Sequence, residues 1–376
     1  MINFNVPICI GDPFKYMRDA IDSQKICGDG KYTRLCSELL EDKIKAKKVF
    51  LTTSGTAALE MACLLLDLDV GDEVILPSFT FSSSATAIIM GRGTPVFVDI
   101  NKDTMNIDEE VIIGAISERT KAIMVVHYAG VSCNMDRIMG IAREYNLLVI
   151  EDAAQGVGAK YKDQYLGTIG DIGCFSFHET KNYSMGEGGA LVLKDDRFID
   201  RAAILREKGT DRTKFISGII DKYTWVDKGS SYLPSDLLAA YLYPQLLEFD
   251  HINNSRIDIF NLYYELLVGV KGIDLPMVCK DCSINGHLFY IKVKDLKQRS
   301  ALLEFLKDNG IYGTFHYIPL HSCIAGVAYG KFIGEDIYTT KESERLIRLP
   351  LYYGLKNEEI IYICDKVKEF IKENNG

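Results

Sequence analysis

Lys181 is the residue whose surroundings most strongly suggest covalent chemistry. It lies in the segment 175–182 (FSFHETKN), directly after a short β-rich run, and the glycine-rich stretch 186–189 follows it. A lysine held in a partly desolvated pocket has a lowered pKa and can attack a carbonyl carbon to form a Schiff base. An exposed loop lysine is the ordinary alternative for any single residue of this type.

The segment 53–58 (TSGTAA) follows a β-rich run and opens a helical pattern. Gly55 lets the backbone approach an anion, and the free N–H groups of a helix N-terminus attract negative charge. The hydroxyls of Ser54 and Thr56 can add hydrogen bonds. A simple helix N-cap explains this segment equally well when it is taken alone.

Two further segments follow predicted strands. The run 147–150 is followed by two acids, Glu151 and Asp152. A carboxylate that faces a pocket at this position suits a cationic ligand, although a solvated strand end is the commoner situation. Phe81, in the segment 77–81 (PSFTF), can stack on a flat ring, and core packing explains it at least as well. Together the four segments supply what a pyridoxal 5′-phosphate (PLP) site needs: an anion cradle, an acid for the pyridinium nitrogen, a stacking face and a lysine.

The elements around these segments must bring them together. Up to residue 250, short β-rich runs alternate with helical patterns, which indicates an α/β fold with a mostly parallel sheet. Ligands of such sheets collect beyond the carboxyl ends of the strands, where all four segments lie. The strands are predicted at 49–52, 73–76, 95–100, 122–128, 147–150, 171–177 and 190–193, with helices that include 56–66 and 196–208.

The pattern changes near residue 250 to that of a smaller α+β domain. We therefore expect a large PLP-binding domain over 1–250 and a small C-terminal domain over 251–376, which suits a chain of 376 residues. A long helical pattern at 238–267 crosses the boundary and precedes predicted strands at 287–293 and 313–317 and helices at 299–309, 341–346 and 358–373.

Composition narrows the range of partners. The chain has 43 Lys and Arg against 52 Asp and Glu, a formal net charge of −9, which argues against nucleic acid or an anionic membrane as the main partner. With no basic region before an apolar core at its start and no membrane-spanning stretch, we expect a soluble, cytoplasmic protein. Most of the ten cysteines are expected to be buried free thiols. Cys279 and Cys282 form a CxxC, but one pair alone is a poor zinc site, so no metal is expected.

Six motifs give the chain a resemblance to a known family. TSGTAAL, PSFTF, EDAAQ, FSFHETKN, GEGGA and FHYIPLH occur in the order found in the DegT/DnrJ/EryC1/StrS sugar-nucleotide aminotransferases. The resemblance covers essentially the whole chain and implies the fold type I (aspartate aminotransferase-like) architecture, PLP as cofactor and a homodimer with shared active sites. Longer strings, such as DKYTW and YTTKESERL, are similar to the branch that acts on dTDP-4-keto-6-deoxy-D-glucose in enterobacterial common antigen synthesis.

The resemblance implies a role for each cofactor-binding residue. Lys181 would form the Schiff base, and Asp152 would pair with the pyridinium nitrogen. Gln155 would lie near the phenolic oxygen of the cofactor, and Phe81 would stack on its ring. The residues that would hold the phosphate are Gly55, Thr56, Ala57 and Ser176.

One phosphate contact would come from the partner subunit. The family places an Asn there, and in the corresponding segment 229–233 of this chain Ser231 stands in its place, with Leu233 where the family has Arg. Lys208 likewise stands where the family has His. These departures agree with the dTDP-sugar branch and mark a subfamily.

Four residues are candidates for substrate contact. His178 lies three residues before Lys181, and packing explains it about as well as a place at the mouth of the site. His316, Tyr317 and His321 belong to FHYIPLH, which the resemblance places near the active-site entrance. Related dehydratases carry His where this chain has Lys181, so the lysine favours transamination.

The resemblance implies a ping-pong reaction that moves the amino group of L-glutamate to the C4 ketone of dTDP-4-keto-6-deoxy-D-glucose. The product would be dTDP-4-amino-4,6-dideoxy-D-galactose, for surface polysaccharide (lipopolysaccharide) synthesis. The alternatives are the C4 epimer, dTDP-4-amino-4,6-dideoxy-D-glucose, or another nucleotide keto-sugar. Intact Lys181 and Asp152 argue against a silent scaffold, and the lack of a strand–GxGxxG–helix unit argues against a nicotinamide oxidoreductase.

Overall fold

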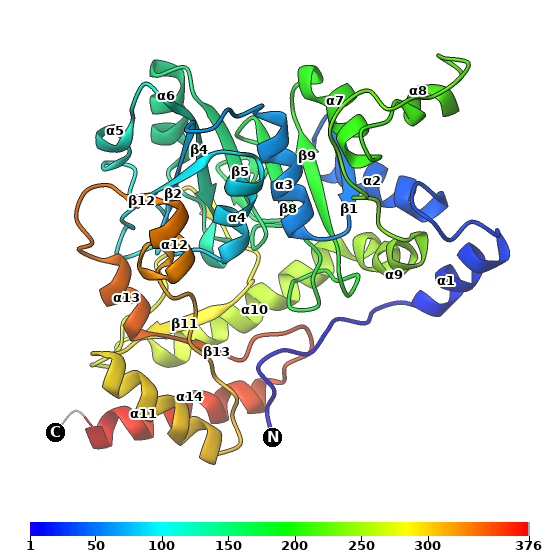
Figure 1. Ribbon diagram of the computed structural model, residues 1–376. Coiled ribbons are helices and arrows are strands. Elements are labelled where there is room, and N and C mark those ends of the chain that lie inside the picture. Colours follow the sequence, from blue (N-terminus) through cyan, green and yellow to red (C-terminus); the bar gives the residue numbers. More distant parts are fainter. Residues whose placement is uncertain (375–376) are drawn as a thin grey trace.

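The large sheet has eight strands in the order β1-β9-β8-β5-β4-β2-β3-β12, in a computed structural model that describes residues 1–374 (Figure 1). Among these strands β9 alone runs opposite to the others. The prediction of a mostly parallel sheet is therefore confirmed. The strands are β1 (Lys48–Thr52), β2 (Glu73–Pro77), β3 (Thr94–Val98), β4 (Thr120–Val126), β5 (Leu148–Asp152), β8 (Ile172–Ser176), β9 (Gly189–Leu193) and β12 (Lys331–Phe332).

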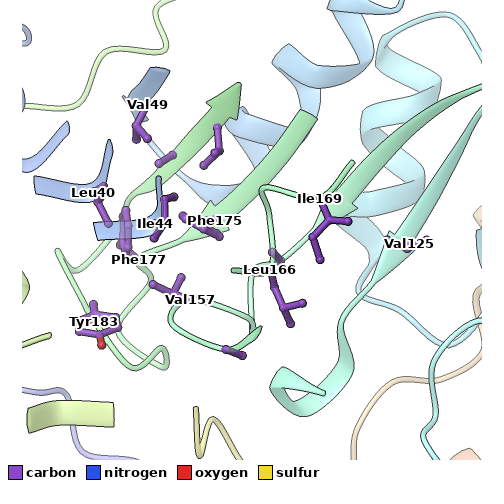
Figure 2. Packing of buried hydrophobic residues seen from close by; sticks show 14 of the residues in the cluster. Leu40, Ile44, Val49, Val125, Val157, Leu166, Ile169, Phe175, Phe177 and Tyr183 are labelled. Carbon is purple, nitrogen blue, oxygen red and sulfur yellow. The ribbon is translucent and has the colours of Figure 1, made fainter. Parts of the chain in front are cut away.

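Helices cover both faces of this sheet, because side chains of each strand point alternately to the two sides. In β4, Ile123 and Val125 join the apolar cluster drawn in Figure 2, whereas Ala122 and Met124 join the cluster on the opposite face. The first cluster includes residues of α2 (Lys31–Ile44), α6 (Met135–Glu144) and α9 (Asp236–Leu247). The second includes residues of α3 (Gly55–Leu65), α4 (Ser82–Met90) and α7 (Asp196–Arg206).

A smaller unit with its own apolar cluster lies at one side of the large sheet (Figure 1). Its two antiparallel strands are β11 (Phe289–Lys292) and β13 (Leu346–Leu349). The N-terminal segment joins this unit, since Ile2 pairs with Ile311 and belongs to the same cluster. The helices that supply the cluster are α10 (Phe249–Leu267), α11 (Leu296–Asp308) and α14 (Asn357–Asn374).

Shorter elements complete the described chain. None of the helices in residues 1–374 is long and apolar enough to cross a bilayer. The remaining helices are α1 (Pro13–Asp22), α5 (Ile112–Ala115), α8 (Arg212–Ile216), α12 (Ile324–Tyr329) and α13 (Thr339–Arg345), with 3₁₀ turns at Tyr128–Gly130 and Leu320–Ser322. The remaining strands, β6 (Lys160–Tyr161), β7 (Gln164–Tyr165) and β10 (Cys282–Ser283), form a small antiparallel sheet.

Three predicted elements were wrong in detail. The helical pattern at 238–267 is two helices, because the last turn of α9 tightens into a bond from the Glu248 N–H to the Gln245 carbonyl before α10 begins. The predicted strand 313–317 is an isolated bridge in which Thr314 pairs with Arg348, since His316 and Tyr317 then turn to stack on each other. The predicted helix 341–346 begins earlier, and its last residue, Leu346, already belongs to β13.

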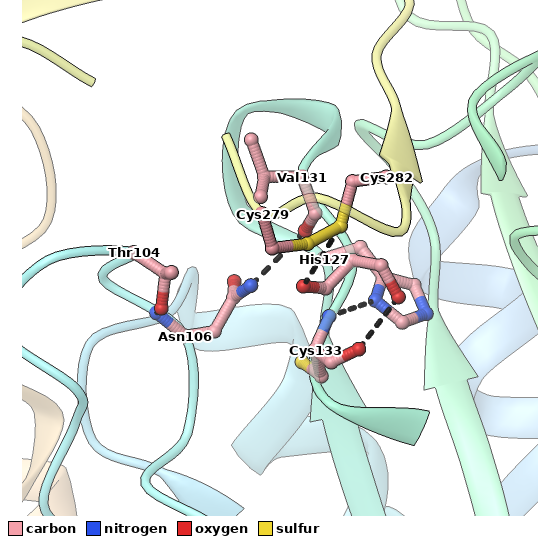
Figure 3. The surroundings of a disulfide bond; sticks show 8 residues. Thr104, Asn106, His127, Val131, Cys133, Cys279 and Cys282 are labelled. Atoms are coloured by element: carbon pink, nitrogen blue, oxygen red, sulfur yellow. Dashed lines mark hydrogen bonds between the residues drawn. A yellow bond between two sulfur atoms is a disulfide. The ribbon is translucent and has the colours of Figure 1, made fainter. Parts of the chain in front are cut away.

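The cysteine prediction needs one correction. Cys279 and Cys282 are joined by a disulfide bond rather than being free thiols, in a turn that leads into β10 (Figure 3). The pair lies against the loop that carries Ser132 and Cys133. Of the other cysteines, five are buried as expected (Cys36, Cys63, Cys133, Cys174 and Cys364), whereas Cys9 and Cys27 are exposed and Cys323 is half-buried.

Candidate active site

A cavity of about 820 Å³ lies at the carboxyl ends of β2, β4, β5 and β8. The large sheet contributes the residues that follow these strands, and the smaller unit closes the opposite side with His287, His316 and Arg348. Phe4 and Asn5 of the N-terminal segment also line it. The cavity is therefore where the topology of a parallel sheet places a ligand site.

The N-terminus of α3 forms one end of this cavity. Ser54 is its N-cap, and the Ser54 Oγ accepts a hydrogen bond from the Ala57 N–H (3.0 Å). Gly55 is required because a Cβ at this position would lie only 2.8 Å from the Cβ of Ser176. The close approach of β8 to the start of α3 leaves the N–H groups of the helix and the Ser176 hydroxyl available to an anion.

A second helix N-terminus lies beside the first. Ser83, in the first turn of α4, hydrogen-bonds to Thr56 of α3 through their hydroxyls (2.7 Å), and both residues line the cavity. Gly189 of β9 packs under the same region, since a Cβ there would lie 2.4 Å from the Ser54 carbonyl oxygen. Two helix dipoles thus point their positive ends at one place, which suits a phosphate group.

The two acids at the end of β5 point to opposite faces of the sheet. Asp152 faces the side of α3 and α4 and lines the cavity, where its carboxylate accepts hydrogen bonds from the Ser84 hydroxyl (2.7 Å) and the Ala154 N–H (3.2 Å). Burial raises the pKa of Asp152, and the Ser84 hydrogen bond opposes this. A buried carboxylate at this position is ready to pair with a cation that enters the cavity.

Glu151 lies on the other face and is a structural residue. Its carboxylate accepts hydrogen bonds from His127 (2.8 Å) and from the N–H groups of Gly167, Ile169 and Gly170. Burial alone would raise its pKa, but the His127 and backbone hydrogen bonds outweigh burial and lower it. Strand alternation therefore separates one acid for the ligand from one acid that anchors the loop 167–170.

Lys181 lines the same cavity as the helix N-termini. Its Nζ forms no hydrogen bond or ion pair with residues 1–374, and its pKa is lowered to about 8 because the amine is shielded from water. The nearby Arg348 lowers this pKa further, whereas the Asp152 carboxylate opposes the shift. Lys181 thus has the environment that the sequence predicted for a nucleophilic amine.

The residues predicted to contact the cofactor ring also line the cavity. Gln155 is held at both ends, because its Oε1 accepts from the Ala129 N–H (2.7 Å) and its Nε2 donates to the Tyr317 hydroxyl (2.8 Å). The ring of Phe81, which precedes α4, is 58% exposed and lies over the cavity with its centroid 6.2 Å from that of Tyr317.

The three candidate histidines occupy different positions. His178 lines the cavity near its mouth and hydrogen-bonds through Nδ1 to the Thr180 hydroxyl (2.9 Å). His316 lines it more deeply and hydrogen-bonds to the Tyr128 hydroxyl (2.7 Å), and burial lowers the pKa of its imidazole well below the usual value. His321 is not part of the described lining, since it bonds instead to Ser78 (2.7 Å) at the end of β2.

Two predicted phosphate residues stay outside the described lining of this cavity. Ala57 is buried in α3 and contributes its backbone N–H to the N-cap bond. Ser231 is exposed on the surface, where its backbone pairs with Glu207. An exposed position fits a residue that acts in a neighbouring subunit, and its role stays a prediction.

Three residues of the site were not predicted: two of them line the cavity, and the third lies behind the lining and bonds to Asp152. Ser84, Arg348 and His287 were not among the predicted site residues, although each carried a signal. Ser84 belongs to a run of three serines directly after the segment 77–81, Arg348 interrupts the apolar run 346–351, and His287 begins a predicted strand. Arg348 donates from its Nε and Nη2 to the Phe315 carbonyl and forms no ion pair with residues 1–374, which leaves donors free for an anionic ligand.

The residues of the cavity fit PLP. The paired helix N-termini suit its phosphate, the buried Asp152 suits its ring nitrogen, and the unpaired Lys181 amine suits its aldehyde. No carboxylate other than those of Asp152 and Glu187 lines the described cavity, and Glu187 lies at the mouth against His178 (3.6 Å). The arrangement can hold a phosphorylated aldehyde and move protons at carbon.

Comparison with known proteins agrees with this chemistry. The DegT/DnrJ/EryC1/StrS aminotransferase family profile matches residues 9–368. GDP-perosamine synthase of Escherichia coli O157:H7 is 31% identical over 370 residues, covering 98% of both chains. The spore coat polysaccharide biosynthesis protein SpsC of Bacillus subtilis is 34% identical over 340 residues, covering 88% of this chain and 87% of SpsC. Among solved structures, the PLP form of the putative sugar aminotransferase Spr1654 from Streptococcus pneumoniae superposes with a TM-score of 0.88 at 28% identity, covering 99% of both chains.

Proposed function

The chain belongs to the DegT/DnrJ/EryC1/StrS aminotransferase family, and from this premise we propose that it transfers the amino group of L-glutamate to the C4 ketone of dTDP-4-keto-6-deoxy-D-glucose. Membership makes it a PLP-dependent sugar aminotransferase of fold type I. The donor, the nucleotide and the configuration at C4 are the proposed part.

The observation that carries the proposal is the pairing of Lys181 and Asp152 in one cavity. With a pKa of about 8, about one Lys181 amine in ten is neutral at pH 7, against about one in three thousand at the ordinary value of 10.5. A neutral amine is the nucleophile that a cofactor aldehyde requires. An ionised Asp152 holds the ring nitrogen protonated.

The residues of the chain then perform the proton transfers. PLP supplies the aldehyde that carries the amino group and the ring that accepts the electron pair of the reacting carbon. Lys181, which would hold the aldehyde of the cofactor, would once free act through its Nζ as the base that takes the proton from the α-carbon of the donor and as the acid that gives it back. With the keto-sugar the same amine moves protons in the opposite direction. Asp152 keeps its charge throughout, and Gln155 fixes Tyr317 against the ring site.

Arg348 supports an acidic amino donor. Its guanidinium is largely withdrawn from water, which lowers its pKa, and it lies above the Phe4 ring (4.8 Å) with no carboxylate partner within residues 1–374. A partly buried cation without a counter-ion is costly, so an anionic ligand that enters this cavity gains from pairing with it. The carboxylate of an amino acid is the ligand of this kind that the reaction requires.

The chain's relatives and motifs support a nucleotide-linked keto-sugar as the amino acceptor. GDP-perosamine synthase and SpsC carry names that refer to nucleotide-sugar or polysaccharide synthesis. Strings such as DKYTW and YTTKESERL favour the dTDP-sugar branch over a GDP-sugar and support a role in surface polysaccharide synthesis. The C4 epimer of the product is the alternative.

The test couples the purified protein, PLP and L-glutamate to the dTDP keto-sugar and to its GDP counterpart. We expect turnover with the dTDP sugar, and proton NMR of the product should show the galactose configuration at C4. The glucose configuration would select the epimer, and turnover confined to the GDP sugar would reject the proposed nucleotide. A protein that stays colourless with added PLP would reject transamination altogether.

We also propose a homodimer in which Ser231 reaches the phosphate of the neighbouring subunit. Exposed apolar residues near this segment support it, since Trp225 is 80% exposed and Ile219 is 70% exposed. One chain has a mass of 42.2 kDa, and light scattering should give twice this mass. Ser231→Ala should weaken PLP binding several-fold without dissociating the dimer, whereas unchanged binding would remove Ser231 from the site.

A further inference from the structure

Arg348 lies in the cavity wall with its guanidinium against an aromatic ring. Its backbone is fixed in β13 and by a bridge to Thr314, and its Nε and Nη2 donate to the Phe315 carbonyl oxygen (3.3 and 3.0 Å). The centroid of the Phe4 ring lies 4.8 Å from the Cζ of Arg348. Nη1 forms no hydrogen bond with residues 1–374, and both Phe4 and Arg348 line the cavity.

The Phe4 ring stabilises this cation in a way that a carboxylate would not. The face of an aromatic ring attracts a guanidinium electrostatically, but it accepts none of the strong hydrogen bonds that the N–H groups can make. A carboxylate partner would occupy those N–H groups and would compete with an incoming anion. The contact with Phe4 therefore leaves Arg348 charged and open to an anionic ligand.

The segment that carries Phe4 is anchored on both sides of the cavity. The Ile2 N–H donates to the Gly310 carbonyl oxygen of the smaller unit (2.7 Å). The Asn5 Nδ2 donates to the Glu179 carbonyl oxygen (3.2 Å), in the loop that leads to the nucleophilic lysine. Phe4 lies between these two anchors, so the position of its ring is set by the protein and not by a ligand.

We propose that Phe4 is a positioning residue for Arg348, whose guanidinium it holds in the cavity wall with Nη1 open to a carboxylate of the amino donor. Without the ring the guanidinium is held by one acceptor only, and a ligand must order it at a cost in affinity. The N-terminal segment is thus part of the site that selects the donor. This inference rests on the proposed function for an acidic amino donor, but not for the identity of the sugar.

The first test measures the binding of glutarate to the PLP-loaded protein by calorimetry. Glutarate has both carboxylates of glutamate and no amine, so it reports the carboxylate site without reacting. Phe4→Leu keeps an apolar side chain and removes the aromatic face, whereas Phe4→Tyr keeps the face. We expect Phe4→Leu to weaken glutarate binding by about 3–10-fold and Phe4→Tyr to bind within about twofold of the parent.

The second measurement is the half-reaction with L-glutamate in single turnover. Phe4→Leu should raise the glutamate concentration at half-saturation by the same factor and leave the rate at saturation unchanged. The reason is that the contact acts on a carboxylate that stays bound before and during the proton transfer. A lower rate at saturation with an unchanged half-saturation would overturn the proposal.

A double variant tests whether the ring acts through the arginine. Arg348→Met should weaken glutarate binding more than Phe4→Leu does, and adding Phe4→Leu to it should cause no further loss. A further loss of the same size would show that Phe4 acts independently and would refute the positioning role. A loss confined to Arg348→Met rejects the role of the ring alone. If Arg348→Met binds glutarate like the parent, the carboxylate site of the proposed function fails as well.

The matched control is a second pair of arginine and phenylalanine outside the described cavity lining. In α7 the Arg197 Cζ lies 4.5 Å from the centroid of the Phe198 ring. Phe198→Leu should change the thermal unfolding midpoint but leave glutarate affinity unchanged. If glutarate affinity instead falls in step with the unfolding midpoint in both Phe198→Leu and Phe4→Leu, the effect at Phe4 is one of general stability and the proposal is wrong.

Discussion

We expect Ser84 to control the charge of Asp152, the acid that is proposed to pair with the cofactor ring. The Ser84 hydroxyl donates to the Asp152 Oδ2 at 2.7 Å and therefore accepts from the Thr80 hydroxyl at 2.9 Å, and all three residues are buried. Asp152 has one other donor, the Ala154 N–H at 3.2 Å. Ser84→Ala therefore removes the shorter of the two described hydrogen bonds to Asp152.

The size of the effect follows from the charge on the acceptor. A hydrogen bond to a buried charged group contributes about 1.5–3 kcal/mol, which corresponds to about one to two pH units in the pKa of Asp152. The pKa of Asp152 is already raised by burial, and Ser84→Ala raises it further. Because PLP pairs with the ionised acid, the pH below which cofactor affinity falls should move up by the same amount.

The assay is an equilibrium titration of cofactor-free protein with PLP, followed by absorbance at several pH values. The phosphate of PLP also titrates near pH 6, so the comparison is between variant and parent at each pH. Ser83→Ala is the matched control, because Ser83 bonds to Thr56 beside the phosphate site and not to Asp152. It should weaken binding equally at all pH values. If Ser84→Ala leaves the pH midpoint where it was, the hydroxyl does not control Asp152.

Substitutions at three further positions test other parts of the protein. Lys181→Ala should abolish turnover and borohydride fixation of the cofactor while the circular dichroism spectrum stays unchanged, and substantial residual turnover would contradict its role. Arg348→Met should lower kcat/KM for glutamate in single-turnover experiments by about 10–100-fold, with Arg348→Lys intermediate, whereas an unchanged glutamate half-reaction would place the guanidinium elsewhere in the mechanism. Glu151→Gln should lower the free energy of unfolding by about 3 kcal/mol at pH 7. Because the pKa of Glu151 is lowered in the folded protein, its carboxylate contributes fully to the free energy of unfolding above about pH 4.5. This contribution is lost as the pH falls through the lower pKa of the folded state. Equal denaturation midpoints of Glu151→Gln and the parent at pH 7 would refute the hydrogen-bond network.

The part of the candidate site that the large sheet builds could be predicted from the sequence. Lys181, Asp152, Gly55 and Phe81 all follow predicted strands, and the carboxyl ends of parallel strands meet at one edge of a sheet. The sequence left open which of the two acids faces the ligand, since Glu151 and Asp152 are equally acidic neighbours. The alternation of buried residues along β5 decides it only when the face covered by α3 and α4 is known.

The part of the candidate site that the smaller unit contributes could not be predicted in the same way. The bond between Asn182 and His287 joins residues 105 positions apart, and Arg348 reaches the cavity from a strand that the helical pattern at 341–346 partly concealed. No local periodicity reports such contacts, because they depend on how two separately packed units meet. The disulfide between Cys279 and Cys282 is the converse case, since its spacing was visible but suggested only a poor metal site.

The residues of the motif FHYIPLH have two different structural roles. Its first histidine, His316, and Tyr317 stack with ring centroids 3.7 Å apart and face the cavity. Five residues later, His321 turns to the opposite side, where it bonds to Ser78 and lies 3.3 Å from the Asp336 carboxylate. His321 therefore joins the end of β2 to the segment that precedes α13 and holds His316 and Tyr317 at a fixed depth. The motif that the resemblance places near the active-site entrance is thus held in position by His321, which is not part of the described cavity lining.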